Sequence, residues 1–166
     1  MPRILLFVLL VIFSVSSVRA QEASGPTAER VKTEIMQLEQ EKIKALLSTT
    51  STKNYAAEWF DRVYVDDIDH SSATGTVKDK AQLLAEFRTG NHRTYRDDQY
   101  NWHIRVYGDG NDGTTVVVNY VASSDVERNG HRAANTDACS DVFVKLNGAW
   151  RMVLHQVTPL PNAQAN

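Results

Sequence analysis

The sequence has few of the residues that cross-link or modify a chain. It holds one cysteine, Cys139, which excludes a disulfide within the chain, so the hydrophobic core must supply the stability. We expect this residue to be a small buried hydrophobe on a strand rather than a reactive thiol. No Asn-x-Ser/Thr acceptor for N-linked glycans occurs at any position.

An excess of basic charge is also lacking. The chain has 18 Lys and Arg residues against 20 Asp and Glu residues, which gives a formal net charge of −2 without any basic stripe. Binding to the phosphates of nucleic acid requires clustered Lys and Arg. We therefore expect no nucleic-acid partner.

Motifs for metals, nucleotides and nucleophilic serines are absent as well. The histidines show no HExxH or other ligand spacing, so we expect no metal site. There are five of them: His70, His92, His103, His131 and His155. No Gly-rich phosphate loop and no Gly-x-Ser-x-Gly elbow occurs, and we expect no cofactor.

The one long apolar run lies at the start of the chain. Arg3 gives a short positive region, residues 4–15 are apolar apart from Ser14, and Val18-Arg19-Ala20 offers small residues for cleavage. The run is shorter than the roughly 20 apolar residues that span a bilayer. We therefore predict a signal peptide over residues 1–20, cleaved near Ala20, and a secreted or periplasmic mature protein without a membrane anchor.

The rest of the chain has the length of one domain. We divide it into a polar spacer over residues 21–26, a single domain over residues 27–160 and a polar tail over residues 161–166. A domain of this size buries about two-thirds of the surface that its unfolded chain exposes.

Three helices are predicted in the first half of the chain. The first begins at Pro26-Thr27 and follows helical spacing to Leu47, with Glu39 and Lys42 as a surface ion pair three residues apart. A second, short helix covers residues 55–62. The third follows Thr76-Val77-Lys78-Asp79, which has the form of a capping box, and ends at Gly90.

Strands are predicted mainly in the second half. A brief strand over residues 63–65 precedes a polar excursion, and four later segments alternate or are rich in β-branched residues. These segments are residues 98–107, 114–123, 131–145 and 149–157. Asn129-Gly130 and Asn147-Gly148 are hairpin signals, since a type I′ turn needs positive φ at both positions. The order of elements indicates an α+β fold with helices on one face of an antiparallel sheet.

Short motifs in this order resemble the SnoaL-like branch of the nuclear transport factor 2-like superfamily, which includes the ketosteroid isomerases. The motifs cover almost the whole mature chain and are listed together: Ile35-Met36-Gln37-Leu38-Glu39; Tyr64-Val65-Asp66-Asp67 with Gly75 and Lys80; Asp141-Val142-Phe143-Val144-Lys145; Gly148-Ala149-Trp150-Arg151; and His155-Gln156-Val157-Thr158-Pro159-Leu160. The subfamily that it resembles most consists of small exported proteins and domains of unknown function.

The resemblance implies a cone-shaped, cystatin-like fold: about three N-terminal helices packed on a strongly bent antiparallel sheet, with a pocket at the open end. It also implies a homodimer that pairs through the bare face of the sheet. The superfamily includes enzymes and binding modules alike. We expect an exported small-molecule-binding or accessory protein, with an isomerase- or lyase-type enzyme acting on a small hydrophobic carbonyl compound as the alternative.

One enzymatic mechanism lacks its central residue. In ketosteroid isomerases a Tyr-x-Asp-Asp motif is followed by the aspartate that abstracts the proton, and the ungapped alignment from Tyr64 places that aspartate at Ser72. A neutral hydroxyl cannot take a carbon-bound proton near neutral pH without another base. The resemblance is therefore to the fold and not to that chemistry.

Three residues remain as candidate bases: His70, Asp137 and His155. His70 has the right unperturbed pKa, although a loop histidine is more often only solvated. Asp137 and Asp141 share one side of their strand, and an inward aspartate beside an aromatic ring would have a raised pKa. We expect at least one of these two aspartates to face solvent.

The faces of the last strand decide which residues reach the pocket. Trp150, Met152, Leu154 and Gln156 alternate on the more apolar side, which we place inward. Gln156 then lies near the pocket; with the sides reversed, His155 would lie there instead. The predicted ligand-pocket residues are Trp59, Trp102, Tyr120, Trp150 and Gln156.

Overall fold

The computed structural model describes residues 21–161, so the predicted signal peptide and residues 162–166 of the tail lie outside the described part. Its elements follow in chain order: α1 (Pro26–Leu47), the 3₁₀ turn η1 (Ser48–Thr50), α2 (Ala56–Val63), β1 (Tyr64–Ser71), β2 (Val77–Lys78), α3 (Lys80–Arg88), β3 (His92–Tyr107), β4 (Thr115–Arg128), β5 (His131–Leu146) and β6 (Ala149–Pro159). Within residues 21–161, no helix is long and apolar enough to cross a membrane.

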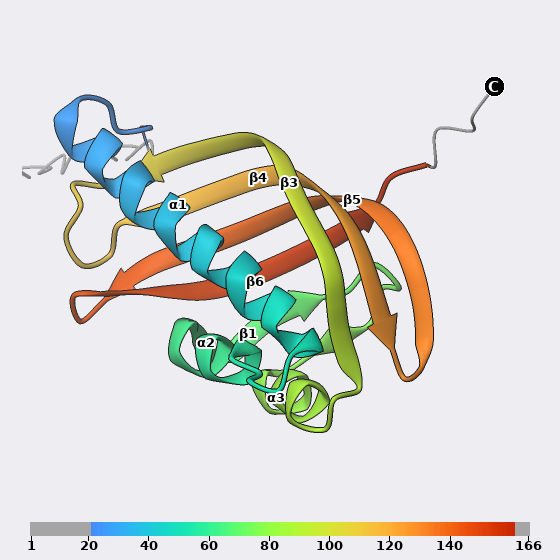
Figure 1. The fold of residues 1–166 in the computed structure, drawn as a ribbon. Helices are drawn as coiled ribbons and strands as arrows, with labels where there is room; N and C mark the ends of the chain where they lie inside the picture. Colours follow the sequence, from blue (N-terminus) through green and yellow to red (C-terminus); the bar gives the residue numbers. More distant parts are fainter. Residues whose placement is uncertain (1–20, 162–166) are drawn as a thin grey trace, which may run out of the picture.

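The strands form one bent sheet in the order β2-β1-β6-β5-β4-β3. The long helix α1 runs across its concave face, and α2 and α3 close one end (Figure 1). All neighbouring strands are antiparallel except β1 and β6, which are parallel. The predicted α+β fold of helices on a strongly bent sheet is confirmed, with this one parallel pair as the difference.

The buried stripe of α1 holds two charged residues. Val31 and Ile35 are fully buried against the sheet, and the same helical spacing continues through Glu39 and Lys42. The predicted surface ion pair is therefore wrong: Glu39 is 0% exposed and Lys42 is 2% exposed. Since charges are costly to bury alone, both must find partners inside the fold.

The segment after α2 is more regular than the sequence predicts. Strand β1 continues to Ser71 through the expected polar excursion, because it pairs with β6 and places His70 beside His155. The capping box of α3 lies three residues later than predicted: Asp79 accepts from the backbone N–H of Gln82, whose side chain accepts from Asp79 N–H. Thr76 instead forms a hydroxyl contact with Thr74.

The two hairpin turns are as predicted. Asn129 and Gly130 have φ of 51° and 80°, and Asn147 and Gly148 have φ of 51° and 76°. Positive φ at both central residues matches the right-handed twist of the flanking strands. These turns fix the register of β4 with β5 and of β5 with β6.

A bulge in β6 reverses the faces of that strand. Met152 pairs with Phe143, but Leu154 pairs with Val142, so one extra residue lies between them. Met152 is fully buried before the bulge, and His155 lines the interior after it. Gln156 is exposed, so the prediction that it faces the pocket is wrong.

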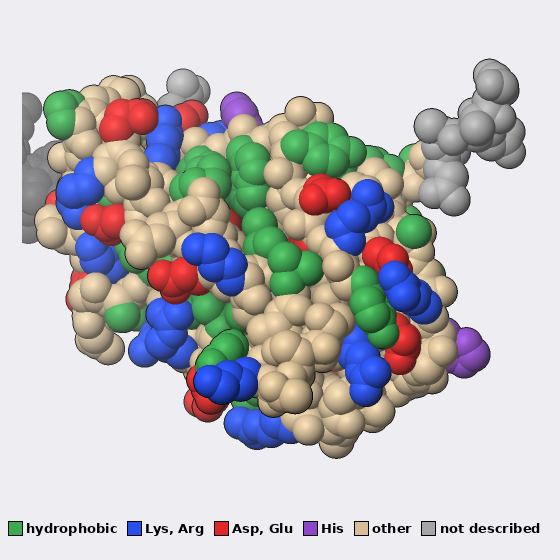
Figure 2. Space-filling model, viewed as in Figure 1, with side chains coloured by type: hydrophobic (Ala, Val, Ile, Leu, Met, Phe, Trp, Pro, Cys, Tyr) green, Lys and Arg blue, Asp and Glu red, His purple; other side chains and the backbone are tan. Residues whose placement is uncertain are grey.

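Charged side chains of both signs are interspersed over the face that carries α1, and apolar side chains gather between α1 and β3 (Figure 2). This face carries no field of a single sign, in keeping with the mixed charges of the sequence.

Candidate functional site

A cavity of about 110 Å³ lies between the concave face of the sheet and the helices. Three candidate bases (His70, Asp137 and His155) and the predicted pocket residue Tyr120 line it. The lining includes apolar residues such as Phe60, Leu83, Phe87, Val126 and Val157, together with polar and charged groups.

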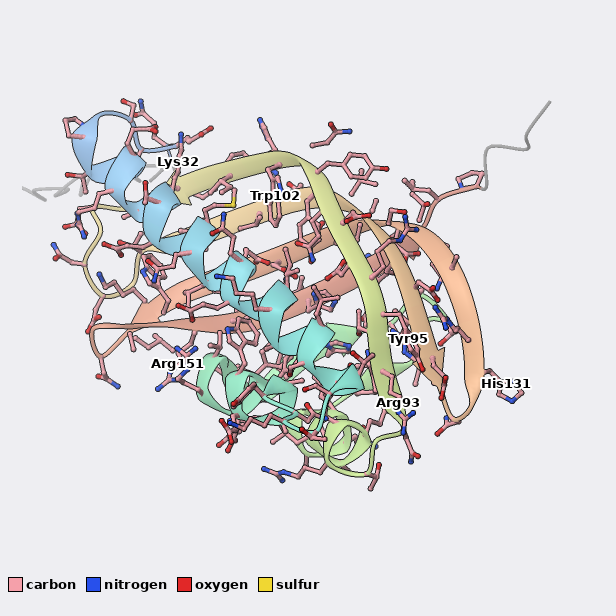
Figure 3. All side chains as sticks on the ribbon, viewed as in Figure 1. Lys32, Arg93, Tyr95, Trp102, His131 and Arg151 are labelled. Atoms are coloured by element: carbon pink, nitrogen blue, oxygen red, sulfur yellow. The ribbon has the colours of Figure 1, made fainter. Side chains whose placement is uncertain are left out.

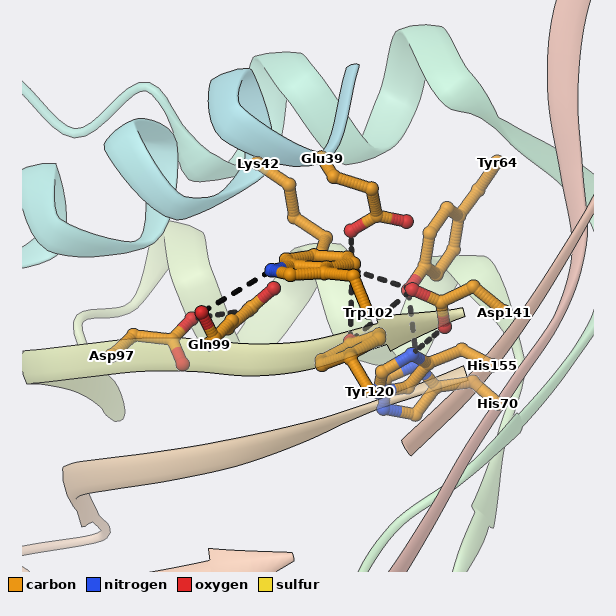
Figure 4. Close-up of polar contacts among 10 residues, drawn as sticks. All are labelled: Glu39, Lys42, Tyr64, His70, Asp97, Gln99, Trp102, Tyr120, Asp141 and His155. Carbon is orange, nitrogen blue, oxygen red and sulfur yellow. Dashed lines mark hydrogen bonds and ion pairs between the residues drawn. The ribbon is translucent and has the colours of Figure 1, made fainter. Parts of the chain in front are cut away.

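His155 forms a hydrogen-bonded pair with a buried carboxylate. Its Nδ1 lies 2.5 Å from Oδ1 of Asp141, which pairs with it across β5 and β6. The Asp141 side chain is 0% exposed, and that of His155 is 13% exposed. The carboxylate thus lies behind the ring, while the ring itself borders the cavity (Figure 4).

Lys42 reaches from α1 to the same carboxylate. Its Nζ lies 2.6 Å from Asp141 Oδ2 and 2.5 Å from Glu39 Oε2, and it donates to the Tyr120 hydroxyl at 3.0 Å. Tyr120 in turn donates to Asp141 Oδ2 at 3.2 Å. These contacts explain how α1 tolerates two charged residues inside the core.

Within this buried group, the pKa values of the two carboxyl groups shift in opposite directions. Burial alone raises the pKa of the Asp141 carboxyl, but Lys42 and His155 outweigh it and hold that pKa well below its usual range. Burial raises the pKa of Glu39 well above its usual value, and the Asp141 carboxylate adds to the effect although Lys42 opposes it. A neutral Glu39 leaves Lys42 and Asp141 as one balanced ion pair.

His70 stacks on His155 with ring centroids 4.7 Å apart. Its Nδ1 lies 3.3 Å from the Tyr64 hydroxyl. Burial lowers the pKa of His70 to about 2, and the neighbouring His155 and Lys78 add to the shift. Burial also raises the pKa of Tyr64, so its hydroxyl keeps its proton and can donate to the neutral imidazole. The prediction that His70 lies in a solvated loop is therefore wrong.

A second polar pair lies on β3. Gln99 donates from Nε2 to Asp97 Oδ2 at 2.9 Å, and the Trp102 indole donates to the Gln99 backbone carbonyl at 3.2 Å. Burial raises the pKa of Asp97, although Lys42 opposes the shift. The Oε1 atom of Gln99 is buried and has no hydrogen-bond partner among residues 21–161.

Asp137 and Cys139 lie on the same inward side of β5 as Asp141. Asp137 is 7% exposed, and burial raises its pKa, although Arg128 opposes the shift. The expectation that Asp137 or Asp141 faces solvent is wrong, because inward residues of β5 alternate and both fall in that register. Cys139 is a buried free thiol, as predicted, and burial raises its pKa to about 12.

Of the predicted pocket aromatics, only Tyr120 lines the cavity. Trp102 stacks on Tyr120 at 4.6 Å and holds it from the β3 side. Trp59 lies in the core and borders a separate depression between α1 and α2. Trp150 donates its indole N–H to Glu34 near the start of α1. Gln156 lies outside the cavity lining, because the bulge in β6 turns it toward solvent.

Ser72 lines the cavity but has no activating base. Its hydroxyl forms a hydrogen bond with the Thr74 hydroxyl at 2.9 Å, and among residues 21–161 it forms none with a histidine or a carboxylate. His131 is exposed at the tip of the β4–β5 hairpin, away from the sheet (Figure 3). Over residues 21–161, no group of three or more His, Cys, Asp or Glu side chains is arranged to hold a metal ion.

Comparison with known proteins agrees with this arrangement. No family model matches the sequence, and no curated protein matches it. Among solved structures, an NTF2-like protein from Cytophaga hutchinsonii covers 78% of this chain and 98% of its own, with 19% identity and a TM-score of 0.67. The chain has the NTF2-like fold.

Two further solved structures are similar to this chain. An NTF2-like protein of unknown function in nutrient uptake from Rhodospirillum rubrum has 22% identity and a TM-score of 0.60, over 76% of this chain and 98% of its own. The CaMKII hub homology domain of Chlamydomonas reinhardtii has 15% identity and a TM-score of 0.58, over 79% and 99%. At these identities the likeness establishes the NTF2-like fold and leaves the chemistry to the site.

The sequence analysis does not predict the buried charged group of Glu39, Lys42 and Asp141. Glu39 and Lys42 interrupt the apolar stripe of α1 at its own spacing, and this interruption is the signal that could have identified them. The strand pattern predicts Asp141 only as one of two aspartates on the same side of β5 and gives no sign that it pairs with His155. No comparable signal marks Asp97 and Gln99, because their inward position depends on how β3 bends.

Proposed function

We propose that this protein is an enzyme that moves a proton on a small carbonyl compound, in an isomerase- or lyase-type reaction. The observation that carries the proposal is His155, which borders a cavity while a buried, ionised carboxylate holds its Nδ1. A histidine–aspartate pair of this kind orients the imidazole and stabilises its protonated form. The same arrangement favours catalysis over the simple ligand-binding or accessory role.

His155 is the general base in this scheme. Because Asp141 is ionised, it accepts a hydrogen bond from the Nδ1–H of His155, and the lone pair of the neutral ring is then on Nε2. Nε2 takes a proton from the carbon next to the substrate carbonyl, and the electron pair of that C–H bond moves into an enolate. Asp141 offsets the positive charge that forms on the ring.

His70 stabilises the enolate. With the Tyr64 hydroxyl donating to Nδ1, the proton of the neutral His70 ring is on Nε2. This N–H donates to the developing enolate oxygen, the type of contribution made by a preorganised oxyanion site. The stacked rings thus supply one acceptor and one donor side by side.

The second half of the reaction returns the proton. Where the substrate has a β,γ double bond, the enolate is a dienolate, and His155 gives the proton to its γ-carbon, which completes an isomerisation. Where the β-carbon carries a leaving group, the enolate electrons form the α,β double bond as the bond to that group breaks, and His155 protonates the departing group, which completes an elimination. Either path restores neutral His155 and consumes no oxidant, reductant or cofactor.

The test measures the exchange of α-hydrogen for solvent deuterium in ketones. Cyclohexanone and substituted cyclohexanones are incubated with the protein in D₂O, and deuterium at the α-carbon is followed by NMR. We expect His155→Asn to lower the protein-catalysed rate roughly 10²- to 10⁴-fold, the usual contribution of a general base. The matched control is His131→Asn, which removes an exposed histidine and leaves the rate unchanged. Binding of ketones without any exchange above the buffer rate would instead support the binding or accessory role.

We also propose that the protein forms a homodimer through the outer face of its sheet. Within residues 21–161 no helix covers this side (Figure 1), and its half-buried valines lie on β4 and β5: Val117, Val121, Val142 and Val144. Light scattering at micromolar concentration should give twice the chain mass, and Val121→Lys with Val142→Lys should give the monomer mass. A wild-type monomer would contradict the proposal.

Export is proposed from the sequence. The predicted cleavage near Ala20 would place the mature chain outside the cytoplasm. Mass spectrometry of the protein recovered from the envelope or medium should show a chain that begins near Gln21. A full-length chain retained in cells would contradict it.

A further inference from the structure

The Gln99 side chain has a buried acceptor that the fold does not use. Its Nε2 donates to Asp97 Oδ2 at 2.9 Å, whereas its Oε1 is shielded from solvent and has no partner among the described residues. Buried polar atoms of native proteins nearly always find a partner, so a ligand or a water is expected there. Both Asp97 and Gln99 line the cavity.

This pair lies at a defined place relative to the two histidines. Gln99, Ala122 and Asp137 form one row across the sheet, and Asp141 with His155 forms another, four residues away along β5. Four residues of strand span about 13 Å between Cα positions, and side chains from both rows shorten the gap. Figure 4 shows Asp97 and Gln99 on one side of the Trp102–Tyr120 stack, and His70 and His155 on the other.

The lining between the two ends is largely apolar. Cys139, Val157 and the Tyr120 ring form the row between the two ends and border the cavity there, with Lys42 Nζ over the Tyr120 ring. A molecule that contacts both ends therefore has a polar group at each end and a hydrocarbon body between them. The acceptor at Gln99 requires that the far group be a hydrogen-bond donor.

We infer that the substrate is a hydroxyl-bearing carbonyl compound, which donates its hydroxyl hydrogen bond to Gln99 Oε1 beside Asp97 while its carbonyl end meets His70 and His155. This inference rests on the proposed function, and it replaces the expected hydrophobic ligand with a bifunctional one. A hydroxyl fits better than an ammonium group, because Lys42 already lies close enough to act on the charge of Asp97.

The experiment compares ketones of matched shape. NMR titrations give the Kd of 4-hydroxycyclohexanone against 4-methylcyclohexanone, and of 4-(hydroxymethyl)cyclohexanone against 4-ethylcyclohexanone, for the wild-type protein. We expect the hydroxylated member of at least one pair to bind about fivefold more tightly, the effect of one hydrogen bond of ordinary strength. The Gln99 side-chain amide signals should shift in the same titration.

Two variants assign the preference to this site. Gln99→Met keeps the length of the side chain and removes the acceptor, so the two members of each pair should bind equally. His155→Asn should lower the rate of α-hydrogen exchange by the factor given above for a general base but keep the hydroxyl preference, so each proposal can fail without the other. The melting temperature of each variant shows that it is folded, and the wild-type comparison needs no variant.

Several results would overturn the inference. Equal affinity within both pairs would mean that water alone satisfies Gln99, and no binding of either hydroxyketone at its solubility limit would count equally against it. Tighter binding of 4-aminocyclohexanone than of 4-hydroxycyclohexanone would show that the site selects a cation. A hydroxyl preference that survives Gln99→Met would place the donor site elsewhere.

Discussion

Lys42 is the single residue on which the buried polar group depends. It is the cation that balances Asp141, and its removal would leave a carboxylate uncompensated inside the core. We expect Lys42→Met to lower the free energy of unfolding by roughly 3–5 kcal/mol, the usual cost of breaking a buried ion pair from one side. Urea denaturation at pH 7 measures it.

Glu39→Gln is the matched control for this prediction. The amide has the shape of the neutral acid that burial favours, so this variant should lose only about 1 kcal/mol, the scale of one hydrogen bond. Equal losses for Glu39→Gln and Lys42→Met would show that Glu39 is ionised in the folded protein. A loss below about 1 kcal/mol for Lys42→Met would contradict the ion pair itself.

The variant Asp141→Asn keeps the His155 ring but removes the carboxylate that orients it, so it tests the contribution of that carboxylate. The amide keeps the volume but can donate as well as accept, so it no longer fixes the Nδ1 proton or offsets the charge on the ring. We expect α-hydrogen exchange to fall roughly 10²- to 10⁴-fold, as it does for His155→Asn. The measurement is the NMR exchange assay at pH 7, and a wild-type rate would remove Asp141 from the mechanism.

At the residue scale, the sequence predicted which side chains could act as bases better than it predicted which side chains bind to them. His70 and His155 were predicted as candidate bases, and both line the cavity. Tyr64 lies on the same strand as His70, and an irregularity of β1 between Tyr64 and Asp69 brings the two side chains together. Asp141 lies on β5, so its pairing with His155 depends on the register of β5 with β6. Lys42 had an ordinary surface explanation, an ion pair three residues from Glu39, that only the packing of α1 rules out.

Among the secondary-structure elements, α3 offers a direct comparison of the predicted and observed caps. Asp79 accepts from the Gln82 backbone N–H at 2.8 Å, whereas Thr76 bonds only the exposed Thr74 hydroxyl. Asp79→Ala should therefore cost about 1 kcal/mol of stability. Thr76→Ala should cost much less, and urea denaturation of both variants distinguishes them. The reverse order would mean that the helix begins where the sequence motif places it.

Elements were predicted well where local chemistry decides them. The helix from Pro26 and the Asn-Gly turns depend on capping, periodicity and positive φ, all of which can be recognised over a few residues. The faces of β6 were not predictable in this way. A single extra residue after Met152 moves His155 inward and Gln156 outward, and the alternation of side chains gives no sign of it.

The pH dependence of stability is a property of the whole molecule. Burial lowers the folded-state pKa of His70 to about 2 and that of His92 to about 3, so below pH 6.5 these two side chains bind more protons in the unfolded chain than in the folded one. Each group therefore lowers stability by up to about 1.4 kcal/mol per pH unit as the pH falls from 6.5 toward those values. Glu39, with its raised pKa, contributes with the opposite sign: its stabilising effect is present at low pH and is lost as the pH rises.

Because these contributions oppose each other, we predict the difference in pH dependence of stability between the wild-type protein and a histidine variant. From pH 7 to pH 5, wild-type protein should lose up to about 2 kcal/mol more stability than His70→Gln. Urea denaturation at several pH values measures this, with exposed His131→Gln as the control that behaves like wild type. Parallel curves for wild type and His70→Gln would contradict the buried, neutral state of His70.

At the scale of the whole molecule, the sequence identified the architecture because many short signals agree. Helix pattern, strand pattern, turns and motif order all favour helices on a bent sheet, and the structure has this arrangement. The cavity was predicted from the family resemblance, but most of its wall was not. Its lining comes from nearly every element, so its chemistry is set by the curvature of the sheet.

The most direct test of the account is the protonation state of His155. Nitrogen-15 NMR of the histidine side chains at pH 7 to 8 distinguishes a protonated nitrogen from one with a free lone pair. We predict a neutral His155 with its proton on Nδ1, a neutral His70 with its proton on Nε2, and loss of the fixed His155 tautomer in Asp141→Asn. A His155 that stays protonated on both nitrogens, or that holds its single proton on Nε2, would contradict its role as the base.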